Sequence, residues 1–560
     1  MFLKNCIFLC MIFTLSNVVT SMAQDDNISS LSEVGAEMLP STIAPYQRNP
    51  FNIPLLKYPV FPDYSVNIEE RGAVKSEPVT ELVNQLIAEI SNRGGGKLII
   101  PEGKWKSGRI ILKSNVNLYL DEGAEIEFSG NAEDYLPSVF TAHEGIEIMG
   151  AGAFIYACGE DNIAVTGKGH IYGPQMDVPV RKNSNSIAWL EKEFPAEVDK
   201  RIFDGMEGRR FFAPKVISPI NCRNVLIEGI TIGRCLFWNV NPIYCENVII
   251  RGITVNSVGI PSGDGIDITS CKNVLIEYCT MNCGDDCYAL KGGRDKDGLR
   301  IGKPTENAII RYCIAKAGHG GVTIGSETAG GIKNIYAYGC VFDGTQIGIR
   351  FKTRRPRAGV SENLFYENFR MINVRDAFVW DLLGTPQFMG DLAKRLPLRP
   401  ITELTPEVKN IHIRSFIIES AKRLIVANGI PEQPFSNVVI ESGSIYCKKL
   451  IPTMNDFKGF TMRDLSITSD DNVINLLDGR DLLLDNIRFT LPENKLYVYM
   501  KGGMVENIEF KNSYSEELKK SAIFQHIKDK ESKDGSPVCG VLEVAISFKY
   551  YKTWCSPEEK

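Results

Sequence analysis

Short apolar stretches divided by polar residues follow one another along most of the chain, and one sequence pattern among them recurs. The pattern is an Asn followed by a mostly apolar triplet. Its copies begin at Asn224, Asn247, Asn273, Asn307, Asn334, Asn363, Asn410 and Asn437. The first five copies are 23, 26, 34 and 27 residues apart. Repeats of this length are typical of solenoids, in which each unit packs only on its neighbours.

The repeating unit predicts strands rather than helices. It consists of short β-branched runs separated by Gly, Asn and Asp, with no helical periodicity between the runs. We therefore predict an all-β fold, a parallel β-helix, with two or three short strands in each coil and neighbouring strands about 4.8 Å apart. An Asn at the same turn of every coil can bond to the Asn of the coils above and below.

One amphipathic helix precedes the repeats. Apolar residues recur at helical spacing from Val79 to Ile90, and the segment ends at the glycines 94–96 before a strand at 97–101. Because open sheet edges invite aggregation, we expect this short helix to cap the N-terminal end of the solenoid.

These patterns divide the chain into four segments. They are a signal peptide at residues 1–23, an irregular N-terminal arm at 24–64, the parallel β-helix domain at 65–525, and C-terminal strands or a cap at 526–560. Two long excursions, 180–215 and 380–406, interrupt the repeats, and the first contains a helix-like stretch around 188–202. Long loops on a solenoid commonly build its binding face.

The N-terminus has the features of a cleavable secretion signal. Lys4 supplies a positive charge, residues 7–15 are apolar, and Ser21-Met22-Ala23 is a small-x-small cleavage site that predicts a mature start at Gln24. The apolar run is shorter than the ~20 residues that a membrane-spanning helix needs, and no later segment is long and apolar enough. We expect a periplasmic or extracellular protein with no membrane span.

Charge and cysteine content limit the kinds of partner, metal site and disulfide that we expect. The formal net charge of −5 and the lack of a long basic run argue against nucleic-acid binding. Two of the 15 cysteines leave with the signal, so the remaining 13 cannot all pair. Cys283–Cys287 and Cys539–Cys555 are plausible disulfides in an oxidising compartment. With five His and no CxxC we expect no metal site and no cofactor, and we expect a monomer.

Four charged motifs follow one another at about the spacing of one coil. They are Ser262-Gly263-Asp264, Gly284-Asp285-Asp286, Gly318-His319-Gly320 and Arg350-Phe351-Lys352. Each motif alone is more typical of a solvated turn or strand. Together, at coil spacing, they predict three carboxylates, an imidazole and two cations on one face of the solenoid. The two cations are two residues apart on a strand, so both should point to that face.

This set of groups suits the hydrolysis of an acidic sugar polymer. One carboxylic acid must protonate the leaving oxygen while another carboxylate activates a water. Crowded carboxylates raise one another's pKa, which keeps one of them protonated. Cations beside them can bind the carboxylate of the sugar.

The four motifs, in this order, resemble those of the polygalacturonase family, family 28 of the glycoside hydrolases. That family carries Asn-Thr-Asp, Gly-Asp-Asp, Gly-His-Gly and Arg-Ile-Lys, and the likeness extends over roughly residues 65–520. The resemblance implies a right-handed parallel β-helix whose catalytic domain is residues 65–525. It also implies an inverting glycosidase that acts on galacturonic-acid linkages in pectin without a cofactor.

The resemblance also implies residue roles. Asp285 would be the general acid, and Asp264 and Asp286 would hold and deprotonate the water. His319 would support the acid.

The remaining family positions bear on the substrate. Arg350 and Lys352 would bind galacturonate near the point of cleavage. The sequence departs from the family where Ser262-Gly263 replaces Asn-Thr, and this change bears on which linkage is cut. Phe351 replaces the middle Ile, at a position that should face the core.

Several functions remain open from the sequence. The leading hypothesis is exo-action on polygalacturonate or pectic oligosaccharides, because the excursions 180–215 and 380–406 could close one end of the groove. A branched pectin such as rhamnogalacturonan is an alternative substrate, motivated by Ser262-Gly263. From other classes, a β-helix pectate lyase would use Ca²⁺ and a basic side chain, and a non-catalytic polysaccharide-binding solenoid would need no stacked acids.

Overall fold

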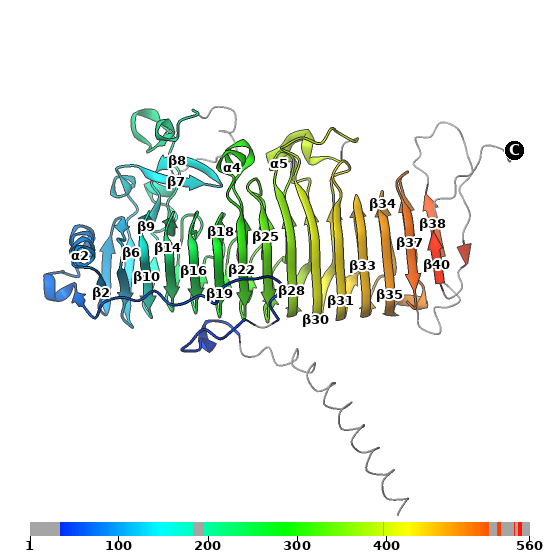
Figure 1. The fold of residues 1–560 in the computed structure, drawn as a ribbon, viewed down its shortest axis with the longest axis horizontal. Helices are drawn as coiled ribbons and strands as arrows, with labels where there is room; N and C mark the ends of the chain where they lie inside the picture. Colours follow the sequence, from blue (N-terminus) through cyan, green and yellow to red (C-terminus); the bar gives the residue numbers. More distant parts are fainter. Residues whose placement is uncertain are drawn as a thin grey trace, which may run out of the picture.

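The computed structural model describes residues 34–46, 48–182, 195–395 and 397–513, together with three strands beyond residue 522. Most of these residues form parallel strands that stack into one long right-handed parallel β-helix. Figure 1 shows the strands side by side from β2 at one end to β40 at the other. The predicted all-β parallel β-helix is confirmed.

The coils build three faces of stacked parallel strands. The first face contains β2 (Gly96–Ile100), β5 (Val116–Leu120), β10 (Asp161–Gly167), β14 (Arg223–Glu228), β16 (Glu246–Arg251), β19 (Lys272–Glu277), β22 (Thr305–Arg311), β25 (Ile332–Tyr338), β28 (Val360–Ile372), β30 (Glu407–Asn428), β31 (Phe435–Lys449), β33 (Phe457–Ser469), β35 (Arg480–Thr490) and β37 (Glu506–Lys511). The second contains β3 (Gly103–Ser107), β6 (Ala124–Phe128), β11 (His170–Tyr172), β15 (Thr231–Gly233), β17 (Thr254–Asn256), β20 (Thr280–Asn282), β23 (Ile314–Ala317) and β26 (Val341–Asp343). The third contains β9 (Ala153–Cys158), β13 (Lys215–Ile220), β18 (Ile266–Thr269), β21 (Tyr288–Lys291), β24 (Gly320–Gly325), β27 (Ile347–Lys352), β29 (Val374–Asp381), β32 (Ile451–Asn455), β34 (Val473–Leu477), β36 (Tyr497–Lys501) and β38 (Ile523–Ile527).

The other elements lie at the ends and along one edge. They are the strands β1 (Ser65–Asn67), β4 (Ile110–Ile111), β7 (Val139–His143), β8 (Ile146–Gly150), β12 (Ile202–Phe203), β39 (Leu542–Glu543) and β40 (Ser547–Tyr550), and the helices α2 (Thr80–Asn92), α3 (Pro179–Lys182), α4 (Asp295–Ile301) and α5 (Pro386–Met389). At the C-terminal end β39 and β40 pair antiparallel with β38 and β37. In Figure 1, β7, β8, α4 and α5 all project from the same edge of the solenoid.

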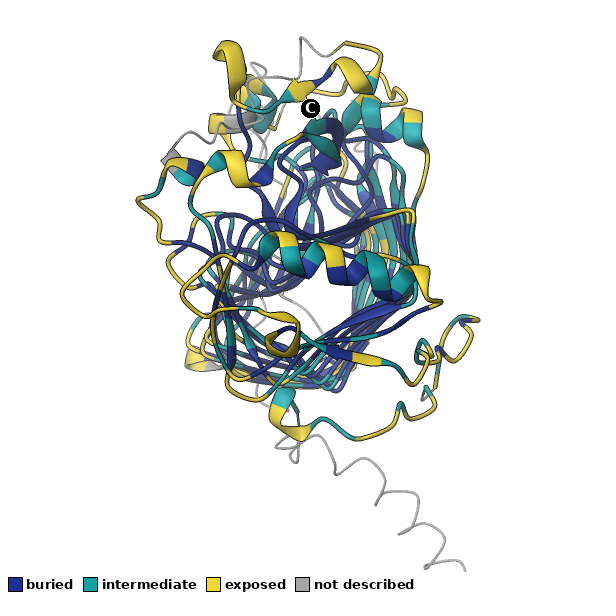
Figure 2. Ribbon diagram, turned by 90° about the vertical axis from the view of Figure 1, so that its left-hand side faces the viewer, coloured by how far each residue is buried: buried dark blue, intermediate teal, exposed yellow. Residues whose placement is uncertain are grey.

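The predicted amphipathic helix is present as α2. Its apolar side, with Val83, Leu86, Ile87 and Ile90, is fully buried and belongs to the main core inside the coils. Figure 2 shows α2 lying across the end of the solenoid with its exposed side outward. A helix in this place covers the apolar interior of the first coils.

The recurring Asn residues form a ladder along the first face, as the sequence predicted. In each step the Asn side-chain Nδ2 donates to the Oδ1 of the Asn one coil earlier, for example Asn247 to Asn224 at 3.1 Å and Asn334 to Asn307 at 3.0 Å. These Asn residues adopt positive φ, which Asn tolerates better than most side chains. The ladder pairs amide groups that are mostly half-buried and fixes where each coil turns.

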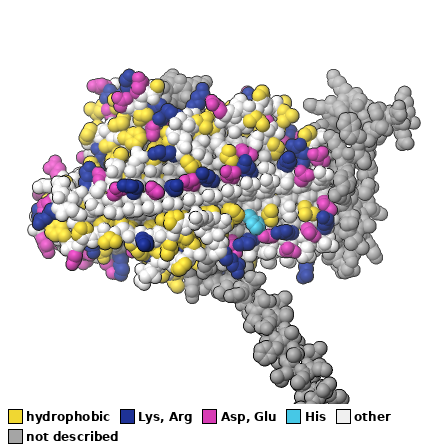
Figure 3. All heavy atoms as spheres, viewed as in Figure 1, with side chains coloured by type: hydrophobic (Ala, Val, Ile, Leu, Met, Phe, Trp, Pro, Cys, Tyr) yellow, Lys and Arg dark blue, Asp and Glu magenta, His cyan; other side chains and the backbone are white. Residues whose placement is uncertain are grey.

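A second ladder, of opposite charges, runs beside the Asn residues. In register order it consists of Asp161, Arg223, Glu246, Lys272, Glu306, Lys333, Glu362 and Lys409. Figure 3 shows this row of alternating colours across the face of the molecule. Opposite charges on neighbouring strands favour this register over a slipped one.

The middle apolar residue of several repeats faces outward, which the sequence analysis did not foresee. Leu226, Ile249, Leu275 and Ile309 nevertheless stay buried, because the N-terminal arm packs over them. The arm contributes Ile53 and Leu56 together with aromatic side chains, and its described residues, 34–46 and 48–64, are irregular apart from one short 3-10 turn. In Figure 1 the arm crosses the strands of this face.

The structure differs from the sequence predictions at one cysteine pair and at one expected helix. Cys283 and Cys287 are separate buried thiols, so the predicted disulfide between them is wrong; Cys287 instead donates to the carbonyl of Ala317 at 3.0 Å, and both thiols fill the core. The described part of the helix-like stretch, 195–202, is a 3-10 turn followed by the start of β12 rather than an α-helix. The signal peptide, residues 183–194, Cys539 and Cys555 lie outside the described residues.

No helix in the described part of the chain combines the length and the apolar character needed to cross a membrane.

Candidate active site

The four predicted motifs lie together on the outer side of the third face. Asp264 precedes β18, Asp285 and Asp286 precede β21, His319 precedes β24, and β27 carries the two cations. The backbones stack directly, since Gly265 N–H donates to Asp286 O and His319 N–H donates to Asp285 O. One oxygen from each of the three Asp carboxylates lies within 4.8 Å of the other two.

His319 and Asp285 form the most accessible part of the site. His319 Nδ1 lies 2.9 Å from Asp285 Oδ1, and the two side chains are 44% and 23% exposed. Burial alone would raise the pKa of Asp285, but the bond from His319 and the field of Lys352 together lower it to about 2. The same bond raises the pKa of His319. The contact therefore favours the carboxylate form of Asp285 and the imidazolium form of His319.

Asp286 is held by both predicted cations. Its carboxylate is almost fully buried, with Arg350 Nη1 3.6 Å from Oδ1 and Lys352 Nζ 3.5 Å from Oδ2. Arg350 also pairs with Asp381 of the next coil at 3.2 Å. Burial would lower the pKa of Arg350, but Asp286 and Asp381 raise it. As predicted, Phe351 between the two cations is buried in the core.

Asp264, like Asp286, is almost fully buried. It is 3% exposed, and burial together with the nearby Asp267 and Asp285 raises its pKa well above the ordinary value. Lys291 Nζ lies 3.9 Å from Asp264 and 3.4 Å from Asp267, and it opposes that shift. Asp264 and Asp285 are therefore driven in opposite directions by their surroundings, which is how one site obtains both an acid and a base.

The charges of the site balance one another. Asp264, Asp285 and Asp286 are the only group of three or more His, Cys, Asp or Glu side chains in the described residues that could hold a metal ion. Each is, however, already matched by a basic side chain: Lys291, His319, or Arg350 with Lys352. A set of this kind is suited to proton transfer and to binding an anion.

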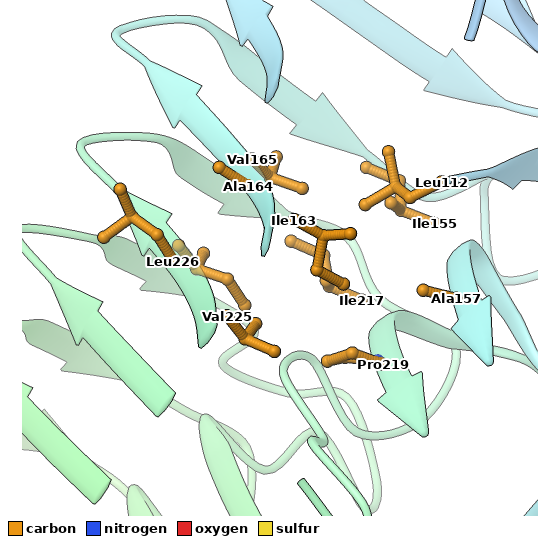
Figure 4. Close-up of a pocket in the computed structure, with 11 residues that line it drawn as sticks. Leu112, Ile155, Ala157, Ile163, Ala164, Val165, Ile217, Pro219, Val225 and Leu226 are labelled. Atoms are coloured by element: carbon orange, nitrogen blue, oxygen red, sulfur yellow. The ribbon is translucent and has the colours of Figure 1, made fainter. Parts of the chain in front are cut away.

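An internal gap between β9, β10, β13 and β14 offers no comparable chemistry. Figure 4 shows that only apolar side chains point into it, among them Leu112, Ile155 and Val225. A gap with this lining belongs to the core.

Residues 204–382, which contain all four motifs, match the family model described as Glycosyl hydrolases family 28. The crystal structure of a hyperthermoactive exopolygalacturonase from Thermotoga maritima is 30% identical to this chain, with a TM-score of 0.64, and the match covers 74% of this chain and 93% of that one. The chain belongs to glycosyl hydrolase family 28. It is therefore a glycosidase.

Two further relatives are similar to this chain at lower sequence identity. The Vitis vinifera protein named "Probable polygalacturonase" is 26% identical to this family 28 glycosidase over 401 residues, which are 68% of this chain and 74% of the relative. The Dickeya chrysanthemi exo-poly-alpha-D-galacturonosidase is 23% identical over 305 residues, half of each protein.

The structure brings together all six residues that the motifs indicated and adds four that they did not. The added residues of this family 28 glycosidase are Asp267, Lys291, Glu327 and Asp381: Lys291 pairs with Asp264, Asp381 pairs with Arg350, and Asp267 and Glu327 pair with Lys291. Asp267 stands three residues after Asp264, and Lys291 stands directly before a Gly-Gly pair. Neither position carries a signal that separates it from an ordinary strand residue.

Replacing His319 with Gln is expected to raise the pKa of Asp285. The substitution removes the bond that contributes most to lowering this pKa, so burial, which raises it, would prevail. We expect the pKa of the Asp285 carboxyl to rise by about one unit or more, which carboxyl-¹³C NMR with labelled Asp can follow. The substitution His412→Gln, which changes a His paired with Glu441 on the first face, is the matched control. An unchanged titration of Asp285 in the His319 variant would contradict the prediction.

Proposed function

We propose that this protein hydrolyses α-galacturonosidic linkages in pectin by an inverting mechanism and releases its product from a chain end. The observation that carries the proposal is the set of three carboxylates matched by an imidazole and two cations on one exposed face. Family 28 membership supports a hydrolase over the lyase and binding-protein alternatives, and the similar proteins named above are polygalacturonases.

In this proposal the three carboxylates divide the proton transfers. Asp285, at the open side, is the general acid that protonates the leaving oxygen. Asp264 and Asp286 hold the attacking water, and Asp264 or Asp286 takes up its proton as the bond to the sugar forms. No covalent intermediate forms, so one displacement inverts the anomeric carbon.

Asp285 needs a proton to act as the general acid, and substrate binding favours its protonated form. Lys352 is one of the groups that lower the pKa of Asp285. A galacturonate carboxylate bound at Arg350 and Lys352 would neutralise that field and exclude water, and both effects raise the pKa of Asp285. The acid would thus become protonated only when an acidic sugar is in place.

A group of elements that we call the hairpin wall, β7, β8, β12 and α4, lies toward the N-terminal end of the edge that holds the site. Within it, Arg201 of the 195–203 segment pairs with Asp297 at 3.0 Å and Arg294 pairs with Glu144 at 2.8 Å. The ring of His143 stacks between Phe212 and Phe237 at 4.3 and 4.4 Å, and Phe237 stacks on Trp238.

Trp238 joins the hairpin wall to the active site, because its ring lies 4.5 Å from the ammonium of Lys291. On the other side, Asp381 begins the excursion that carries α5. A site bounded in this way favours binding of a chain end. The 30% identity to an exopolygalacturonase supports the same conclusion.

Loosening the hairpin wall is expected to change the products. The substitution Arg201→Ala removes a buried ion pair that joins β12's segment to α4. We expect the early products to shift from monomer toward oligomers of mixed length, measured by anion-exchange chromatography. Arg209→Ala is the control, because Arg209 pairs only with Asp204 and Glu207 at the exposed tip of the same segment. Monomer as the sole early product of both variants would reject the wall as the cause of exo-action.

The deciding experiment follows the hydrolysis of unesterified polygalacturonate by proton NMR from the earliest times. We expect monogalacturonate, released first as the β-anomer. The Asp carboxylate oxygens lie closer together than the ~6.5–9.5 Å typical of inverting glycosidases, so the anomer released first is the sharpest test of the mechanism. First release of the α-anomer would reject inversion, and a mixture of long oligomers would reject exo-action.

A branched pectin is the second candidate substrate. Ser262-Gly263 stands where the family has Asn-Thr, directly before Asp264. Turnover of a rhamnogalacturonan but not of polygalacturonate would favour it. For either substrate we propose action in the periplasm or outside the cell, which the N-terminal sequence motivates and which fractionation of producing cells would test.

A further inference from the structure

Lys291 is a buried lysine at the end of β21, beside the carboxylates of the site. Its side chain is 5% exposed, and three carboxylates surround its ammonium: Glu327 at 3.3 Å, Asp267 at 3.4 Å and Asp264 at 3.9 Å. The ammonium also donates to the carbonyl of Gly325 at 3.4 Å. The ring of Trp238 covers another side at 4.5 Å. The ammonium therefore has no room for a sugar beside it.

The surrounding charges do not pair one to one. Asp267 is fully buried, and neither of its carboxylate oxygens accepts a hydrogen bond within the described residues. Asp264 and Asp267 come from the preceding coil, whereas Glu327 comes from the following coil, where Arg357 approaches it to 4.0 Å. One ammonium is thus shared by three acids. Keeping two neighbouring carboxyl groups ionised in a buried place is unfavourable in free energy.

The position of Lys291 relative to the reacting groups decides its effect. Its ammonium touches Asp264, which the proposed function assigns to the attacking water, and it touches no other carboxylate of the catalytic trio within ion-pair distance. Asp285 and Asp286, on the turn before β21, are matched instead by His319 and by Arg350 with Lys352. Lys291 is the cation that belongs to the base side of the site.

We propose that Lys291 is a positioning residue of the hydrolysis, whose ammonium favours the ionised form of the Asp264 carboxylate against the burial and the neighbouring acids that favour its protonation. The inference rests on the proposed function. Glu327 sets how much of this ammonium's charge is left for Asp264, because Lys291 divides its interaction between the coils on either side. Removing Lys291 and removing the charge of Glu327 must then act on Asp264 in opposite directions.

Lys291 opposes the groups that raise the pKa of Asp264. Burial raises the pKa of Asp264 most, with Asp267 and Asp285 adding to it, and Lys291 is the cation that opposes them. Burial also raises the pKa of Asp267, to about 7. Burial would raise the pKa of Glu327 as well, but Lys291 and Arg357 hold it well below its usual range.

The test compares Lys291→Met, Lys291→Arg and Glu327→Gln by carboxyl-¹³C NMR titration of Asp-labelled protein, with Asp264→Asn to assign the signal. We expect the pKa of Asp264 to rise by about one unit or more in Lys291→Met and to fall in Glu327→Gln. In Lys291→Arg, which keeps the charge, it should stay within about half a unit of the parent value. Shifts of Lys291→Met and Glu327→Gln in the same direction, or no shift in either, would overturn the proposal.

Kinetics on polygalacturonate adds a second readout. The acidic limb of the kcat/KM profile should move to higher pH in Lys291→Met and to lower pH in Glu327→Gln, because the base must be ionised in the free enzyme. In Lys291→Met we expect kcat to fall by about tenfold or more while KM changes by less than about threefold. Circular dichroism would show whether Lys291→Met folds. If it does not, the pKa of Asp264 in Lys291→Arg and in Glu327→Gln still tests the proposal. The NMR titration needs no substrate, so a protein inactive on polygalacturonate would reject the proposed function while the titration would still judge Lys291.

Discussion

Replacing Asp285 with Asn is expected to lower kcat for polygalacturonate by about 10²–10⁴-fold, the range typical for loss of a general acid. The Asn side chain has nearly the same shape but cannot give a proton to the leaving oxygen. Arg350 and Lys352 remain in place beside Asp286, so substrate should still bind and KM should change little. Initial rates of reducing-end release measure the effect.

The control for this substitution is Asp161→Asn. Asp161 is an exposed member of the charged ladder on the first face, where it pairs with Arg223 far from the carboxylate trio. Its variant should keep nearly the parent rate. An Asp285→Asn variant that keeps more than about a tenth of the parent kcat would contradict the assignment of Asp285 as the acid.

The largest expected effect on stability comes from Glu277. This carboxylate is completely buried under the N-terminal arm and joins two buried guanidinium groups, with Oε1 2.7 Å from Arg251 Nε and Oε2 2.6 Å from Arg311 Nη2. Replacing it with Gln leaves two buried positive charges without their common partner. We expect the free energy of unfolding to fall by about 3–5 kcal/mol, measured by denaturant titration.

Glu306→Gln is a matched control for that prediction. Glu306 also joins cations of both neighbouring coils, Lys272 at 3.3 Å and Lys333 at 2.9 Å, but these lysines are about half exposed. Surface pairs of this kind contribute about 0–1 kcal/mol, so the variant should unfold almost as the parent does. Equal losses in the two variants would show that burial under the arm does not set the value of the Glu277 contacts.

The arm explains why Glu277 is buried at all. Arg251 donates to the carbonyl of Pro40 at 2.8 Å, and Arg311 donates to the carbonyl of Ala44 at 2.8 Å. The arm thus gives hydrogen-bond acceptors to guanidinium groups that it shields from water. Without the arm, the outward Leu and Ile side chains of this face would be exposed to water.

The repeat, the Asn ladder and the six charged residues of the site could be predicted from the sequence alone. The reason is geometric: in a parallel β-helix, positions one coil apart stack, so Asp264 comes to lie beside Asp286, and the strand that carries Arg350 stacks on the same face two coils later, whatever the loops between them do. The alternation of side chains along a strand placed Phe351 inside and its neighbours outside.

The outward orientation of the middle residues, the partners of Lys291 and the protonation of the site depend on the tertiary structure. A continuous apolar run such as Val274-Leu275-Ile276 does not show that its middle residue faces outward, and the arm that covers this residue comes from more than 200 positions earlier in the chain. Lys291 likewise has no local signature, because its acidic partners lie on the coils before and after its own. Protonation depends on burial and on the distances between charges, and both are set by contacts between coils rather than by neighbours in sequence.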